Sequence, residues 1–117
     1  MDIKRYVEGA NFCNALTANG FVFVSGDASE APVEGIEAKA KDLFARLDAS
    51  LEECGSDKEH IVAATIYLAD IDRDFDGFNK AWQEWLGDGP RPSRSCVQVK
   101  LIDQSWLVEI TLTAVVK

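Results

Sequence analysis

The pattern of apolar and polar residues in the opening part of the chain favours short strands. Residues 2–7 predict a first edge strand, and residues 11–16 and 21–25 predict two more. The pair Asn19-Gly20 lies between the last two segments and favours a tight hairpin turn. We therefore expect a hairpin over residues 11–25.

Apolar residues then recur at the helical period of about 3.6 residues over positions 36–51. Pro32 suits the first turn of this helix, and Gly55 suits its C-cap. Residues 61–68 follow and are apolar on both faces. A strand of this kind is expected at the centre of a sheet, with a helix on one side and another layer on the other.

A second helix is predicted from about Phe75 to Leu86. Asp74 is its expected N-cap and Gly87 its terminator. Three aromatic residues are expected to face the core: Phe78, Trp82 and Trp85. Asn79 lies beside this aromatic stripe.

The C-terminal part returns to strict alternation, which predicts strands over residues 93–101 and 106–116. If the link around Asp103 closed a hairpin, the apolar faces of the two strands would coincide and so would the polar faces. Val97 would then lie opposite Ile110. Under this register Arg94, Cys96 and Gln98 share the polar face with Glu109 and Thr111.

This predicted polar face brings an arginine, a thiol and a carboxylate together, which is typical of a site for a small molecule. Each residue also has a plainer interpretation. Arg94 and Glu109 could neutralise each other across an interface, and Cys96 could be a small buried filler, since no histidine lies near it to lower its pKa.

The predicted order β, β, β, α, β, α, β, β indicates one α+β domain over residues 1–117. Two helices cover only one face of a sheet. The opposite face is therefore expected to be solvated or buried in an oligomer, where a cleft between subunits could bind a ligand.

Composition narrows the possible functions. Twenty acidic and twelve basic residues give a net charge of −8, which disfavours a nucleic-acid ligand. Three cysteines without close spacing and a single histidine, His60, argue against a disulfide framework and a metal site. No segment matches a membrane span or a signal peptide, so we expect a cytoplasmic protein.

Several segments resemble the RidA family, also called the YjgF family, and most closely its short YoaB-like branch. The resemblance covers nearly the whole chain, and its C-terminal half is the most specific part. The matching segments are residues 20–26, residues 55–70, Phe75 to Trp82, Arg94 to Val97, and Val108 to Ile110. It implies a chorismate-mutase-like fold with one mixed sheet and two helices on one face. It also implies a homotrimer whose sheets line a central barrel, with three sites at the subunit interfaces.

The resemblance implies an enamine or imine deaminase. Such an enzyme hydrolyses small 2-imino acids, of the 2-aminoacrylate and 2-iminopropionate type, to 2-keto acids and ammonia, without a metal or organic cofactor. Arg94 corresponds to the arginine that binds the substrate carboxylate, and Glu109 to the glutamate that orients water. The other positions expected to bind substrate are Cys96, Ser25, Gly26, Asn79 and Cys13.

This sequence departs from the family pattern at two positions. Cys13 stands where the archetype has a tyrosine, and Thr111 stands where it has a second acidic residue. Loss of the tyrosine favours an alternative function, a non-catalytic protein that binds small carboxylates such as 2-keto acids. A third alternative, an endoribonuclease or translation inhibitor, is disfavoured by the acidic balance.

Overall fold

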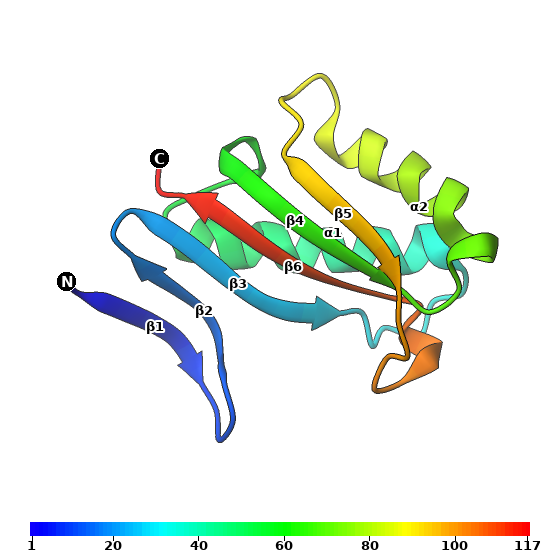
Figure 1. Cartoon of the computed structure of the whole chain (residues 1–117), viewed down its shortest axis with the longest axis horizontal. Coiled ribbons are helices and arrows are strands. Elements are labelled where there is room, and N and C mark those ends of the chain that lie inside the picture. The colour runs from blue at the N-terminus through cyan, green and yellow to red at the C-terminus, as the bar shows by residue number, and fades with distance from the viewer.

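The computed structural model describes all residues from 1 to 117 and contains one six-stranded sheet. Its strands are β1 (Ile3–Glu8), β2 (Cys13–Ala18), β3 (Phe21–Ala28), β4 (Ile61–Leu68), β5 (Ser93–Gln98) and β6 (Val108–Val115). Their order in the sheet is β1-β2-β3-β6-β4-β5 (Figure 1). Neighbours are antiparallel except β4 and β5, which are parallel, so the sheet is mixed as expected.

Two helices, α1 (Ile36–Glu53) and α2 (Ile71–Leu86), cover one face of this sheet. In Figure 1, α1 runs behind the strands and α2 lies beside the edge strand β5. Two short 3₁₀ helices, Lys58–His60 and Gln104–Trp106, precede β4 and β6. The core fills the layer between the helices and the sheet, and Leu43, Leu47, Ile66, Phe78 and Ile110 are fully buried in it. Neither helix is long and apolar enough to cross a membrane.

The predicted order of elements is confirmed, and so is the hairpin between β2 and β3. Asn19 and Gly20 have φ values of 52° and 80°, as a tight turn with two left-handed residues requires. The central strand is found over Ile61–Leu68, as predicted. Its buried residues alternate with partly exposed ones, so only one of its faces is covered.

The predicted starts of both helices are wrong. Helix α1 has Gly35 as its N-cap, and Pro32 lies in the preceding loop. Helix α2 begins at Ile71, because the Asp70 carboxylate accepts a hydrogen bond from the Arg73 backbone N–H at 3.0 Å. Asp74 is instead a buried residue inside the helix.

The predicted hairpin of the two C-terminal strands is also wrong. β4 lies between β5 and β6, so Tyr67 pairs with Val97 on one side and with Glu109 on the other. The long connection over residues 99–107 allows β5 to lie at the edge of the sheet, beyond β4, whereas a tight turn would have forced β5 and β6 together. Val97 is therefore on the face opposite to Ile110.

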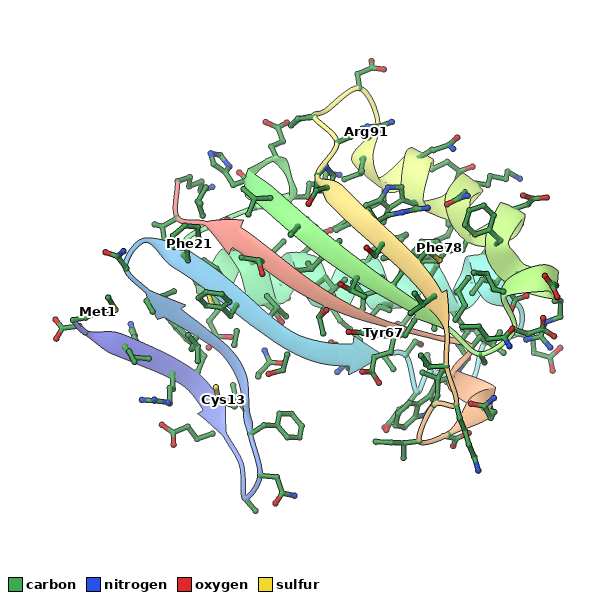
Figure 2. The ribbon with its side chains drawn as sticks, viewed as in Figure 1. Met1, Cys13, Phe21, Tyr67, Phe78 and Arg91 are labelled. Atoms are coloured by element: carbon green, nitrogen blue, oxygen red, sulfur yellow. The ribbon has the colours of Figure 1, made fainter.

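The face of the sheet without helices carries large apolar side chains. Phe21, Phe23 and Val97 are 41%, 43% and 41% exposed, and Tyr67 lies on the same face. Figure 2 shows Phe21 and Tyr67 in front of the sheet and Phe78 behind it, toward the helices. An apolar surface of this kind is typical of a contact with another protein or another subunit.

Candidate functional site

Arg94 extends from β5 toward helix α2. It pairs with the buried Ala64 of β4, and partners in neighbouring strands point to the same face, so its side chain is on the helix side of the sheet. Its Nη1 donates a hydrogen bond to Asn79 Oδ1 at 2.8 Å. Its Cζ lies over the ring of Trp82, 5.5 Å from the centroid. The amide and the indole together hold the guanidinium at the edge of the sheet.

Cys96 lies two residues after Arg94 in β5, so its side chain points to the same face of the sheet. It pairs with the core residue Ile66 and packs against the core while remaining partly exposed. Burial raises the pKa of the Cys96 thiol, and the nearby Arg94 guanidinium lowers this pKa by less. The thiol is therefore protonated at neutral pH, which makes it a poor nucleophile.

Glu109 lies on the opposite face of the sheet. It pairs with Ala28 of β3 and Tyr67 of β4, and it forms neither an ion pair nor a side-chain hydrogen bond within the chain. Its carboxylate lies against Gly26, where a β-carbon would collide with Oε2. The absence of a side chain at Gly26 therefore makes room for the carboxylate.

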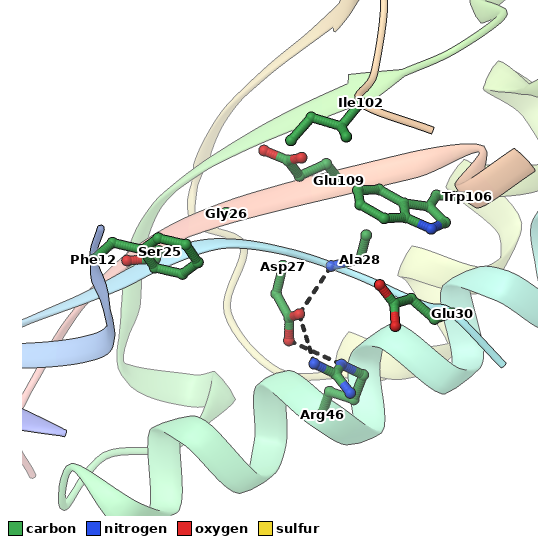
Figure 3. Close-up of a pocket in the computed structure, with 10 residues that line it drawn as sticks. All are labelled: Phe12, Ser25, Gly26, Asp27, Ala28, Glu30, Arg46, Ile102, Trp106 and Glu109. Carbon is green, nitrogen blue, oxygen red and sulfur yellow. Dashed lines mark hydrogen bonds and ion pairs between the residues drawn. The ribbon is translucent and has the colours of Figure 1, made fainter. Parts of the chain in front are cut away.

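The Glu109 side chain lines a pocket of about 520 Å³ at the edge of β3 (Figure 3). Ser25, Gly26 and Ala28 of β3 line it, with Ile102 and Trp106 above them in Figure 3 and Phe12 beside Ser25. This pocket lies beyond the last residues of β3 that pair with β2, where a bulge between Val24 and Asp27 shifts the register. Bulges often reorient side chains next to functional sites.

An ion pair that the sequence did not indicate closes the other side of this pocket. The Arg46 guanidinium donates to both carboxylate oxygens of Asp27, at 2.8 and 3.0 Å. The Asp27 carboxylate raises the pKa of Arg46. Nothing in the sequence pattern connects these residues, since Arg46 lies on the polar side of α1 and Asp27 follows the bulge. Trp106 also lines this pocket; the sequence predicted it as the first residue of a strand, whereas it is the last residue of a short 3₁₀ helix.

The predicted site residues therefore form two groups. Arg94, Cys96 and Asn79 lie on the helix side, near β5 and α2, and Ser25, Gly26 and Glu109 line the pocket at the edge of β3. The prediction that Arg94 and Glu109 share one face is wrong, because it depended on the hairpin of the two C-terminal strands.

Cys13 is connected to this pocket through its backbone. Its backbone carbonyl accepts a hydrogen bond from Ser25 Oγ at 2.7 Å, while its side chain is not among the groups that line the pocket. Ser25 thus uses its hydroxyl proton within the chain and presents only its oxygen lone pairs to the pocket. Thr111 lies on the same face as Glu109, next to Thr65 of β4.

Comparison with known proteins agrees with this architecture. A family model described as Endoribonuclease L-PSP matches residues 3–116. The RutC family protein YoaB of Escherichia coli strain K12 is 36% identical over 116 residues, which cover 99% of this chain and 100% of that protein. A RutC family protein of Haemophilus influenzae is 33% identical over 115 residues, which cover 97% and 98% of the two chains.

Among solved structures, a YjgF family member from Neisseria meningitidis matches with a TM-score of 0.95 at 38% identity, covering 100% of this chain and 97% of that one. The α+β, chorismate-mutase-like fold expected from the sequence is therefore confirmed. The chain belongs to the RidA/YjgF family, whose model carries the description Endoribonuclease L-PSP and whose relatives include the RutC proteins.

Proposed function

We propose that the protein hydrolyses small 2-imino acids, of the 2-aminoacrylate and 2-iminopropionate type, to 2-keto acids and ammonia. The observation that carries this proposal is the unpaired charge of Arg94. Its guanidinium is partly buried, its one hydrogen bond goes to the neutral amide of Asn79, and no carboxylate of the chain forms an ion pair with it. A partly buried charge without a counter-charge favours an anionic ligand, and the planar guanidinium matches a carboxylate.

The proposed active form is a homotrimer with a site at each subunit interface. Two features support it. The sheet face without helices carries exposed apolar side chains, including Phe21, Phe23 and Val97, and within one chain the sheet separates Arg94 from Glu109. A ligand of only a few atoms cannot reach both side chains in one chain. In the trimer, Arg94 of one subunit would extend to the pocket of Glu109 in its neighbour.

The chemistry that follows needs positioning more than a strong nucleophile. Arg94 binds the carboxylate and so fixes the imine carbon beside it. Glu109 accepts a hydrogen bond from water and takes its proton while the water oxygen forms a bond to the imine carbon. The proton passes to the nitrogen, which gives a tetrahedral carbinolamine.

Breakdown of the carbinolamine completes the reaction. The hydroxyl proton moves to Glu109 and then to the nitrogen as the C–N bond breaks, and the electron pair of that bond leaves with ammonia. The carbonyl of the 2-keto acid forms at the same carbon. One water is consumed, one ammonia is released, and Glu109 returns to its starting charge.

Binding of small carboxylates without catalysis is the second candidate. It uses the same Arg94 site, and Cys13 and Thr111 favour it because they replace a tyrosine and an acidic residue of the family pattern. A solved relative from Entamoeba histolytica is called a putative endoribonuclease, but the net charge of −8 of this chain disfavours an RNA substrate.

The deciding experiment measures the loss of freshly generated 2-iminopropionate, trapped with semicarbazide, in the presence of the wild-type protein. Arg94→Ala and Glu109→Gln are the test variants. Arg5→Ala and Glu34→Gln are matched controls, because both residues are exposed and neither side chain forms a hydrogen bond or an ion pair. We expect faster imine loss with the wild type and both controls, and a decrease of about a hundredfold or more in both test variants.

Two results would contradict this proposal. The first is a wild-type protein that does not accelerate imine loss, which, combined with saturable pyruvate binding that requires Arg94, would support the binding protein instead. The second is full activity in Arg94→Ala, which would remove the carboxylate anchor from the scheme.

A further inference from the structure

We infer that Trp82 and Asn79 are positioning residues that hold the Arg94 guanidinium in a fixed plane and leave its charge available to the ligand. This inference rests on the proposed function, because it concerns the same carboxylate-binding arginine. Neither residue needs to touch the substrate. Their role follows from what each contributes to Arg94: a rigid aromatic surface on one side and a neutral hydrogen-bond acceptor at one nitrogen.

Trp82 is a rigid support because it is itself held in the core. It is 4% exposed, and its ring contacts the rings of Phe44, Phe78 and Trp85, with centroids at 6.0, 6.0 and 5.6 Å. A guanidinium over an indole is attracted by the negative face of the ring. The indole therefore restrains both the position and the tilt of Arg94, which would otherwise sample many rotamers at the edge of the sheet.

Asn79 restrains Arg94 without neutralising it. Its Oδ1 accepts from Nη1 at 2.8 Å, which is a short and well-formed hydrogen bond. An aspartate in this place would have almost the same shape but would form an ion pair with the guanidinium. That pair would compete with any carboxylate ligand. The amide therefore fixes one nitrogen, and the other N–H donors of the guanidinium remain available.

The two groups together explain why an unpaired arginine is stable at this edge of the sheet. Part of its desolvation is offset by the aromatic ring and by one neutral hydrogen bond, and its remaining donors have no acceptor within the chain. Such preorganisation reduces the conformational entropy that the Arg94 side chain loses when a ligand binds. Removal of either support should therefore weaken carboxylate binding more than it slows the chemical step.

The first test compares Asn79→Asp with Asn79→Ala, with Gln83→Glu as the control. Gln83 is exposed on the same helix and does not contact Arg94, so Gln83→Glu adds the same negative charge away from the guanidinium. KM for 2-iminopropionate and Kd for pyruvate are measured together with kcat. We expect Asn79→Asp to raise KM and Kd by about tenfold or more, Asn79→Ala to raise them less, and kcat to change little.

This order of effects separates the inference from a purely structural role. Aspartate retains the shape of asparagine, so a packing role predicts that Asn79→Ala is the more harmful variant. An ion pair with Arg94 predicts the opposite order. A larger increase of KM in Asn79→Ala than in Asn79→Asp would overturn the inference.

The second test compares Trp82→Leu with Phe78→Leu. Both substitutions remove an aromatic ring from the same buried cluster, but only Trp82 lies under Arg94. We expect Trp82→Leu to raise KM and Kd by about threefold to tenfold more than Phe78→Leu does, at a temperature where both variants are folded. Equal effects of the two substitutions would contradict the role of Trp82.

Failure of the proposed function gives a different result. A wild-type protein that neither hydrolyses 2-iminopropionate nor binds pyruvate contradicts the proposed function. A wild-type protein that does either, while the order of the Asn79 variants is reversed, contradicts only the inference drawn from Asn79 and Trp82.

Discussion

Arg94 and Glu109 lie on opposite faces of one sheet, with strand β4 between their strands. Arg94 pairs with Ala64 on the helix side, and Glu109 pairs with Tyr67 on the uncovered side. No rotamer change brings two such side chains to one small ligand, because the backbone of the sheet separates them. If both act on one substrate, they must come from different subunits.

Mixing two inactive variants tests this consequence. Arg94→Ala lacks the anchor and Glu109→Gln lacks the base, but in a mixed trimer one variant supplies an intact Arg94 to the intact Glu109 of the other. Random reassembly of an equal mixture should restore about a quarter of the wild-type activity, because each site receives both intact residues with that probability. The measurement is imine loss after the mixture is dissociated and reassembled.

Each variant reassembled alone is the control and is expected to remain inactive. A mixture that stays inactive, although mass spectrometry of intact complexes shows that mixed trimers have formed, would indicate that the two residues do not share a site across subunits.

Gly26→Ala should move the Glu109 carboxylate without unfolding the protein. The new β-carbon would meet Oε2 of Glu109 and would lie 3.1 Å from Cδ, and the carboxylate is the mobile end of a side chain. We expect stability to change little and kcat to fall on the order of tenfold to a hundredfold, as small displacements of reacting groups do. Steady-state imine hydrolysis and urea unfolding measure the two quantities.

A double-mutant cycle provides the control for this substitution. In the Glu109→Gln background, Gly26→Ala should cause little further loss of kcat, because the group that it displaces is no longer a base. Multiplied losses in the double variant would mean that the alanine acts on the pocket by another route.

The elements of the fold were predictable because each has a local signal. The Asn19-Gly20 turn, the helical period of residues 36–51 and the apolar run of residues 61–68 act within short stretches of sequence. The start of α2 was not predicted correctly, because Asp70 and Asp74 are both good caps in sequence. Only the observed hydrogen bond from the Arg73 backbone N–H to Asp70 distinguishes them.

The position of β5 was not predictable from its alternation. The usual rule assigns the apolar side of a strand to the core, but Val97 faces the uncovered side, and Arg94 and Cys96 face the helices. The rule fails at this edge because the uncovered face also carries apolar side chains, among them Tyr67, which pairs with Val97. The residue types of the site were therefore recognised, while their arrangement on two faces was not.

Cys96 should behave as an ordinary or weakly reactive thiol. Burial raises its pKa and Arg94 lowers this pKa, so Arg94→Ala should raise the pKa further. We expect the midpoint of the pH profile for iodoacetamide alkylation to lie above the ordinary cysteine value in the wild type and to move higher in Arg94→Ala. The experiment uses a Cys13→Ser, Cys54→Ser background, so that only Cys96 reacts.

The midpoint is the proper readout here, because loss of the arginine side chain also changes the access of the reagent and hence the absolute rate. A midpoint below the ordinary cysteine value in the wild type would show an activated thiolate. That result would reopen covalent catalysis by Cys96.

Asp70→Ala should lower the free energy of unfolding by about 1 kcal/mol, as the loss of a helix N-cap does. The Asp70 carboxylate accepts from the Arg73 backbone N–H at 3.0 Å, whereas its contact with the Arg73 guanidinium is long, at 3.9 Å, and exposed. The ion pair therefore contributes little, and the cap accounts for most of the effect. Urea unfolding followed by circular dichroism measures the change.

Asp72→Ala is the matched control for the cap. Asp72 lies in the first turn of the same helix, is exposed and forms no hydrogen bond, so its removal should cost only a few tenths of a kcal/mol through the helix dipole. If the helix were capped at Asp74, as its sequence predicted, Asp70→Ala would be no more harmful than Asp72→Ala. A clear difference between the two variants therefore locates the start of α2, and with it the turn that links the central strand to the helix holding Asn79 and Trp82.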